Sequence, residues 1–303
     1  MAKMPSDAEL KRVLQIDDAA LSMFRKVREG ALAEAKRLDA KKTGKIKVLG
    51  FSGSARDEFD MAQEGSNSEE LLKRCLGECE KLGAQAELVQ LRNMHIEHCK
   101  ACYSTTNMQC HFYCSCYPKG SPTGDDMSNV LYDKILAADA VIFATPVNNF
   151  KMSTPMAAFL DRCISLDGSL SPANPKKPKD RELNIKHTKF VELTADIDTP
   201  GTGTLHRFAG KVGGMIVTGH EEGASMVISS LFMALSHFWI LFPPFSNMYA
   251  MASVCNSTYA DKKMVLGECY DTEVKLLARN VMKGAELARK AKFSDWPYDN
   301  SKD

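Results

Sequence analysis

The sequence predicts an α/β protein built on a doubly wound, five-stranded parallel sheet. Two observations lead to this prediction. From residue 46 onward, short apolar segments alternate with segments of helical periodicity, and most apolar segments end in small or polar residues before the next helix begins. We therefore expect one elaborated domain over residues 45–303, preceded by a helical extension over residues 1–44 and interrupted by two long insertions.

The N-terminal extension has an apolar stripe of its own. Between Ser6 and Leu38, apolar residues recur near helical spacing with charged residues between them, and Ser6 or Asp7 can cap the first turn. A linker of Lys, Thr and Gly at residues 41–45 then leads into the domain. The stripe predicts a helical arm that packs on the core or on a second subunit.

Five pairs of a strand and a helix follow the linker. Each strand is a short apolar run, and in each helix apolar residues recur three to four positions apart. The predicted strands cover residues 46–52, 85–91, 139–145, 211–218 and 246–251, and the predicted helices cover residues 67–82, 125–137, 153–165, 222–237 and 271–292. One insertion, at residues 92–124, is rich in cysteine, and the other, at residues 166–208, is typical of a surface excursion.

The composition is that of an ordinary globular chain. The 303 residues are 44% hydrophobic and 25% charged, and 39 basic against 38 acidic residues give a net charge of +1. Such a balance provides no global attraction to nucleic acid or to a membrane surface. The N-terminus lacks the apolar core of a secretory signal. We expect a cytoplasmic protein whose partner is a small molecule or a redox protein.

The end of the first predicted strand is a candidate phosphate site. Its apolar run breaks into Ser, Gly and Arg, and a Ser-Asn-Ser sequence then opens the next helix, so hydroxyls, backbone N–H groups and the helix dipole can converge on one anion. The glycines do not fit the G-x-G-x-x-G of dinucleotide sites, and no G-K-[ST] is present, so the phosphate of FMN fits best. The candidate residues are Ser52, Ser54, Arg56, Ser66, Asn67 and Ser68.

The end of the fourth predicted strand also breaks into glycine before a helix. The candidate residues there are Thr218, Gly219, His220 and Gly223. Glycine backbone can approach the pyrimidine edge of a flavin closely, and a helix N-terminus favours the negative charge of a reduced flavin. The alternative interpretation is a tight turn with a surface histidine.

Five cysteines lie within the first insertion. Their spacing is Cys99-x2-Cys102-x7-Cys110-x3-Cys114-x-Cys116, which is denser than packing requires. Four thiolates are the ligand set of an iron–sulfur cluster. The same thiols, with nearby histidines, can equally form a tetrahedral zinc site, or they can be unligated or redox-active.

These motifs together resemble a known family. They are G-S-A-R at residues 53–56, S-N-S at 66–68, C-K-A-C at 99–102, D-D-M at 125–127, A-T-P-V at 144–147 and F-L-D-R at 159–162, and their order along the chain is preserved. The chain resembles the NADPH-dependent FMN reductase family, and its cysteines make it most similar to the iron–sulfur flavoproteins. The resemblance implies a flavodoxin-like strand order, FMN at the carboxyl ends of the strands, and a homo-oligomer with flavin near subunit contacts.

The resemblance also implies roles for two further sets of residues. The loop after the third strand would lie against the flavin ring through Thr145, Pro146, Val147, Asn148, Asn149 and Phe150. Asn148 stands where the family has an aromatic residue, and Phe150 is the candidate substitute. Cys99, Cys102, Cys110 and either Cys114 or Cys116 would bind a [4Fe–4S] cluster, although Thr105 stands where the family has its third cysteine.

The expected function is an FMN-dependent oxidoreductase without a protein acid–base pair. NAD(P)H or a ferredoxin-like donor would reduce the flavin, and electrons would pass, with or without an iron–sulfur cluster, to a small-molecule or protein acceptor. The alternatives are a non-enzymatic flavin and iron–sulfur electron carrier and a zinc-stabilised flavodoxin-like binding protein.

Overall fold

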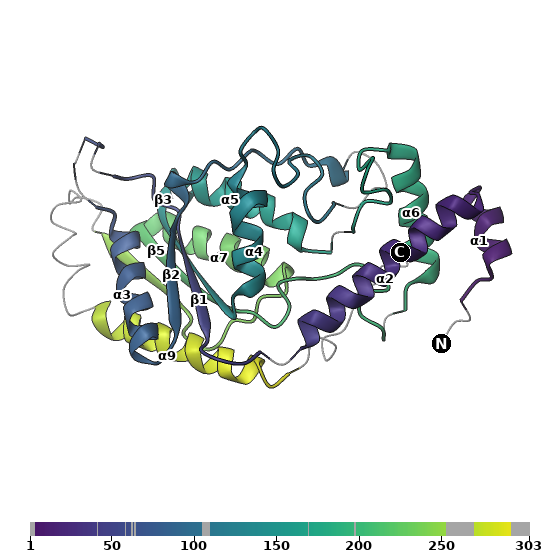
Figure 1. The fold of residues 1–303 in the computed structure, drawn as a ribbon. Helices are drawn as coiled ribbons and strands as arrows, with labels where there is room; N and C mark the ends of the chain where they lie inside the picture. The colour runs from purple at the N-terminus through teal and green to yellow at the C-terminus, as the bar shows by residue number, and fades with distance from the viewer. Residues whose placement is uncertain are drawn as a thin grey trace.

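In the computed structural model, a parallel β-sheet lies between two layers of helices (Figure 1). The structure describes residues 4–40, 42–57, 59–61, 63, 65–104, 110–168, 170–196, 198–252 and 270–291. Its parallel strands are β1 (Lys47–Ser52), β2 (Gln85–Gln90), β3 (Ala140–Asn148), β5 (Val212–His220) and β6 (Asn247–Ala252). They are arranged in the order β2-β1-β3-β5-β6, which is the flavodoxin-like order. The predicted fold class is confirmed.

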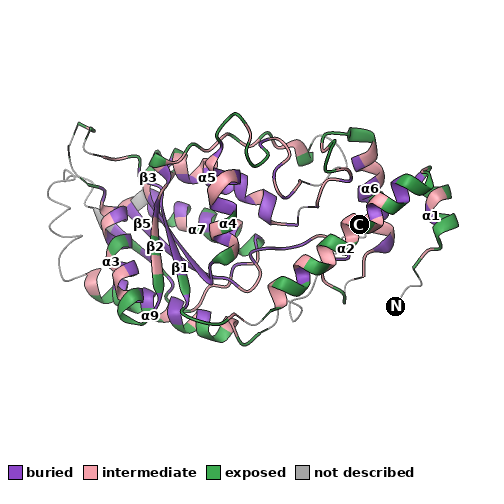
Figure 2. Cartoon of the chain, in the orientation of Figure 1, coloured by how far each residue is buried: buried purple, intermediate pink, exposed green. Residues whose placement is uncertain are grey.

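The two faces of the sheet carry separate layers of helices, because successive side chains of a strand point to opposite faces. Helices α3 (Asn67–Lys81) and α9 (Asp271–Ala288) pack on one face, and α4 (Tyr132–Ala137), α5 (Thr154–Cys163) and α7 (Glu221–His237) pack on the other. The central strands β1, β3 and β5 are almost continuously buried, whereas the edge strands β2 and β6 are partly exposed (Figure 2). No helix in the described part of the chain has both the length and the apolarity needed to span a membrane.

The third strand differs from its predicted length. Instead of ending at residue 145, β3 continues to Asn148 and turns back into the short antiparallel strand β4 (Lys151–Met152). Asn149 and Phe150 form the turn with φ angles of 50° and 63°, so both adopt the left-handed conformation of a tight hairpin turn. This hairpin carries the loop that was predicted to contact the flavin ring.

The N-terminal extension packs on the second insertion. Helices α1 (Asp7–Leu14) and α2 (Asp18–Asp39) contact α6 (Arg181–Thr194), and the ring centroids of Phe24 and Phe190 are 5.5 Å apart. Residues 166–208 are therefore not a mere surface excursion, since they supply the helix that covers the apolar stripe of the extension. The buried residues of this stripe, Leu10, Leu14, Leu21 and Phe24, pack on α6 of the same chain. The alternative of a second subunit stays a prediction.

A buried arginine joins both ends of the cysteine-rich insertion to the domain. Arg162, at the end of α5, is 2% exposed and donates to both carboxylate oxygens of Asp125 at 2.7 and 2.8 Å and to the carbonyl oxygen of Glu97 at 2.9 Å. Its guanidinium lies 4.8 Å from the ring centroid of Tyr117. Through Glu97 and Asp125, Arg162 thus connects the start and the end of the insertion to α5, the helix that follows the β3–β4 hairpin.

We predict that Asp125→Ala destabilises the protein by about 3–5 kcal/mol, because it leaves the Arg162 charge buried without its partner. Glu286→Ala is the matched control, since it removes an acid from the exposed Lys283–Glu286 pair and should cost less than about 1 kcal/mol. Urea unfolding of both variants measures the difference. Equal costs for the two variants would contradict the anchoring role of Arg162.

Candidate functional site

The loops that follow β1 and β3 are joined by hydrogen bonds. The Gly53 N–H donates to the Ala144 carbonyl at 2.7 Å, and the Ser153 hydroxyl donates to the Gly53 carbonyl at 2.5 Å. The Ser153 N–H donates to the Thr145 hydroxyl at 3.1 Å. A Cβ atom at position 53 would lie 2.8 Å from Ser153 Oγ, so only glycine allows this approach. The predicted phosphate loop after β1 and the predicted flavin-ring loop after β3 are therefore neighbours.

The loop that follows β5 packs directly on the β3–β4 hairpin. A Cβ atom on Gly219 would lie 2.7 Å from Val147 Cβ, and one on Gly223 would lie 2.4 Å from Val147 Cγ1. The space that these glycines leave is thus filled by Val147. Thr218 is buried beside them, and the side chain of His220 lies outside the described residues.

The turn of the hairpin presents polar and aromatic side chains to solvent. Asn148 and Asn149 are exposed, and Phe150 is 55% exposed, so Phe150 is not a core residue. Pro146 and Val147 are half-buried where the strand leaves the sheet. An exposed ring on a rigid hairpin offers an apolar face to a planar ligand.

The N-terminus of α3 offers hydrogen-bond donors to an anion. Ser66 is the N-cap residue, but its side chain makes no capping bond; its Oγ lies 2.9 Å from that of Ser68. Asn67 has a buried Oδ1 atom with no hydrogen-bond partner among the described residues. The first N–H groups of a helix also lack intrahelical partners, and the helix dipole favours negative charge there. A phosphate fits this position, since a flipped carboxamide would donate hydrogen bonds to it.

Ser52 has a different environment from the other serines. Its hydroxyl donates to Glu69 at 2.9 Å, and the Glu69 carboxylate also accepts from Gln90 at 2.7 Å, from Lys73 at 3.0 Å and from the Arg92 guanidinium. Burial acts to raise the pKa of Glu69, but these partners, Arg92 first, outweigh it and lower the pKa to about 2. Two cations thus face one carboxylate, which leaves an excess of positive charge beside the N-terminus of α3.

Sequence analysis did not identify Glu69 or Arg92. One signal could have identified them. Glu69 is an acidic residue in the first turn of a helix whose N-terminus was expected to bind an anion, and its negative charge can be tolerated there only if cations lie nearby. Arg92 follows β2, and its role depends on the pairing of β2 with β1, which the sequence alone does not reveal.

The predicted phosphate ligand Arg56 has a partner within its own loop. Its Nε atom lies 3.2 Å from Asp60 Oδ2, and its backbone N–H donates to the buried Ser54 hydroxyl at 3.2 Å. The acidic residues after Arg56 therefore neutralise its charge in this structure. Ser54 and Arg56 lie on the same loop as the other candidates, but their polar groups are engaged with each other and with Asp60.

The predicted metal ligands divide into two sets. Cys102 and Cys116 have Sγ atoms 3.7 Å apart, and Cys110 and Cys114 adjoin them, since the Cys110 thiol raises the pKa of Cys102 and the Cys116 thiol raises that of Cys114. Cys99 is oriented differently, and its sulfur accepts from the Ala101 N–H at 3.4 Å. Among the described residues, no three His, Cys, Asp or Glu side chains are arranged to hold a metal ion. The structure therefore does not confirm an iron–sulfur cluster, which stays a prediction.

The thiols and the hairpin adjoin opposite ends of α5. Cys114 and Tyr117 adjoin Arg162, in the last turn of α5, whereas the hairpin contacts Ser153, the N-cap of the same helix. Nine residues of helix separate Ser153 from Arg162 by roughly 14 Å. The position of the cysteines at the flavin edge stays a prediction.

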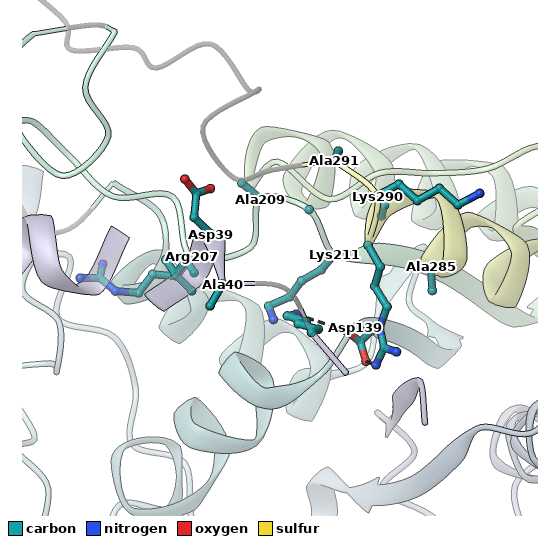
Figure 3. Close-up of a pocket in the computed structure, with 14 residues that line it drawn as sticks. Asp39, Ala40, Asp139, Arg207, Ala209, Lys211, Ala285, Lys290 and Ala291 are labelled. Atoms are coloured by element: carbon teal, nitrogen blue, oxygen red, sulfur yellow. Dashed lines mark hydrogen bonds and ion pairs between the residues drawn. The ribbon is translucent and has the colours of Figure 1, made fainter. Parts of the chain in front are cut away.

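A cavity of 420 Å³ lies at the opposite edge of the sheet and is not a second candidate for this site (Figure 3). Its charged groups satisfy one another: Asp139 Oδ2 lies 2.7 Å from an Arg289 nitrogen, and Asp139 Oδ1 lies 3.3 Å from Lys42 Nζ. The buried Lys211 donates to the Ala138 carbonyl at 2.6 Å, and burial lowers its pKa well below the ordinary value. The cavity lies at the junction between the N-terminal extension and the sheet.

Part of the chain is similar to known proteins. Residues 46–182 match the NADPH-dependent FMN reductase family. An iron–sulfur flavoprotein from Methanosarcina thermophila is 27% identical over 121 residues, which are 40% of this chain and 54% of that protein, so the match spans about half of the relative's length.

Two solved structures are similar to this chain. RosB with the bound intermediate 8-demethyl-8-formylriboflavin-5′-phosphate aligns with a TM-score of 0.56 at 18% identity, over 82% of each chain. A flavone reductase aligns with a TM-score of 0.46 at 22% identity, over 80% of this chain and 63% of that one. At such identities the RosB likeness concerns the fold alone.

We predict that protonation of Glu69 lowers the stability of the protein in acid. Its pKa is depressed from 4.5 to about 2 on folding, so its contribution is complete above the unfolded value and is lost as the pH falls from 4.5 toward 2. Urea unfolding between about pH 6 and about pH 3 should therefore show a weaker dependence on pH for Glu69→Gln than for the native protein. Glu70→Gln, on the neighbouring half-buried position, is the control. If both variants follow the native pH dependence, the Glu69 network is not ionised as described.

Proposed function

We propose that the protein is an FMN-dependent oxidoreductase, because residues 46–182 match the NADPH-dependent FMN reductase family. NAD(P)H or a ferredoxin-like protein would supply electrons, and a small molecule or a redox protein would accept them. The single observation that supports FMN most strongly is the buried, unpartnered amide oxygen of Asn67 at the N-terminus of α3. It lies on the loop side of the sheet that the β3–β4 hairpin also occupies.

The phosphate of FMN would be held by backbone and neutral side chains rather than by an arginine. The first N–H groups of α3, the Asn67 amide and the Ser66 and Ser68 hydroxyls are the donors. Arg92 and Lys73 would add positive charge without contact, because both are bound to Glu69. Ser52 would act through Glu69, and Arg56 would need to leave Asp60 before it could contact the phosphate.

The flavin ring would lie against the hairpin and the β5–α7 loop. The exposed Phe150 ring and the backbone of residues 145–149 are the available surfaces, and the N-terminus of α7 favours negative charge on the pyrimidine side. Bound FMN would supply the redox chemistry itself, as flavins do in other oxidoreductases. The protein would orient the ring and tune it, and we assign no catalytic acid or base.

An iron–sulfur cluster is the finer part of the proposal, supported by the sequence resemblance and by the name of the archaeal relative. Because the described thiols are not arranged around a metal, we derive no electron-transfer step from such a cluster. Iron and sulfide analysis of anaerobically purified protein tests it. Iron together with sulfide would favour a cluster, whereas zinc without flavin would favour the alternative of a zinc-stabilised binding protein.

A homo-oligomer also belongs to the proposal. Its support is now the family resemblance alone, because the apolar stripe of the N-terminal extension packs on α6 of the same chain. Light scattering on the full-length protein tests it, and a monomer would exclude it.

We predict that Asn67→Ala weakens FMN binding about ten- to a hundredfold, because a hydrogen bond to a charged group contributes about 1.5–3 kcal/mol. Asn67→Asp should weaken it further, since the new carboxylate repels the phosphate. Riboflavin, which lacks the phosphate, is the internal control and should bind both variants as it binds the native protein. Flavin titration measures the affinities. Equal losses for FMN and riboflavin would place the phosphate elsewhere.

We also predict multiple turnovers of NADPH oxidation by the FMN-loaded protein with a small acceptor. Gly223→Ala should lower the turnover rate by up to about a hundredfold, because the added methyl group displaces Val147 and with it the hairpin. Gly77→Ala is the control, since no atom lies within 4 Å of a Cβ built there. A protein that is reduced once but never turns over would instead be an electron carrier.

A further inference from the structure

Two half-buried thiols of the cysteine-rich insertion face each other. The Sγ atoms of Cys102 and Cys116 are 3.7 Å apart, and no disulfide joins the described cysteines. Rotation of the side chains that brings the sulfurs roughly 1.7 Å closer would reach the length of a disulfide bond. We propose that Cys102 and Cys116 are a redox-active pair that a hydroperoxide converts into an intrachain disulfide.

Accessibility distinguishes this pair from the neighbouring thiols. Cys102 and Cys116 are half-buried, whereas Cys110 and Cys114 are 9% and 7% exposed. An oxidant from solvent therefore reaches the first two sulfurs more readily. Cys99 is also half-buried, but its sulfur accepts a hydrogen bond from the Ala101 N–H and has no thiol as its partner.

A cation lies near Cys116. The Lys100 ammonium is 5.2 Å from the ring centroid of Tyr117, the residue that follows Cys116 in the chain. Because a cation beside a thiol favours its reaction with an oxidant, we assign Cys116 as the attacking sulfur.

The reaction proceeds in two balanced steps. The Cys116 thiolate attacks the terminal oxygen of the hydroperoxide, so an S–O bond forms, the O–O bond breaks, and the other oxygen leaves, with one proton, as an alcohol or water. The Cys102 sulfur then attacks the sulfenic acid, so the S–S bond forms and a molecule of water leaves. Two thiols lose two electrons in total, and the hydroperoxide gains them. A dithiol reductant reverses the oxidation by exchange.

The disulfide would change what the insertion can do. It joins the two ends of the segment from residue 102 to residue 116, and it removes two sulfurs from any set of metal ligands. Oxidation and metal binding at these cysteines would therefore exclude each other. The inference does not depend on flavin binding, so it can be tested separately from the flavin part of the proposed function, but it competes with the iron–sulfur part.

Peptide mapping of the full-length protein after treatment with hydrogen peroxide tests the pair. We expect a cross-linked peptide that contains Cys102 and Cys116, the loss of two reactive thiols, and recovery of both after reduction with dithiothreitol. Cys102→Ser and Cys116→Ser should each abolish the cross-link. Cys99→Ser is the matched control in the same insertion and should leave it intact. Circular dichroism of each variant confirms that the comparison is made between folded proteins.

Three outcomes would overturn the inference. One is a cross-link to Cys110 or Cys114 in place of the predicted pair. Another is oxidation of single cysteines to sulfinic acid without any cross-link. The third is stoichiometric iron or zinc in the purified protein that protects the thiols from peroxide until a chelator removes it, because the four sulfurs would then be metal ligands.

Discussion

The buried guanidinium of Arg162 determines how the cysteine-rich insertion is attached to the sheet. The charge can be buried only because Asp125 accepts from it twice and the Glu97 carbonyl and the Tyr117 ring complete its surroundings. These partners come from both ends of the insertion and from the segment that leads into α4. The middle of the insertion is held by other contacts, because the Leu170 N–H donates to the Cys110 carbonyl and the Ser165 hydroxyl donates to the His111 carbonyl. The position of the cysteines thus follows from Arg162 together with the segment that follows α5.

The strands and helices could be predicted because each follows from a local pattern. Apolar runs predicted the five parallel strands, and the strand order followed from the resemblance. The length of β3 could not be predicted in this way. It extends to Asn148 because Val147 finds space against Gly219 and Gly223, and such a contact between distant segments leaves no periodic signal.

The site was predictable to a similar extent. The serines and Asn67 were identified because their residue types before a helix suit an anion, and the structure brings them to one helix end. The partners of these residues were not identified, since the Glu69 network depends on the pairing of neighbouring strands. For the cysteines, the spacing identified the thiols but could not distinguish a metal centre from a dithiol pair. That distinction depends on distances between sulfurs on a folded loop.

The contact of Val147 with two glycines has a mechanical consequence. Neither glycine has room for a side chain, because a Cβ atom would lie 2.7 Å from Val147 at position 219 and 2.4 Å from it at position 223. Movement of the hairpin away from the sheet would open a gap at the β5–α7 loop, and inward movement would bring Val147 into overlap with the glycine backbone. Displacement of one loop would therefore be transmitted to the other, so the two loops resist deformation as one stiff unit.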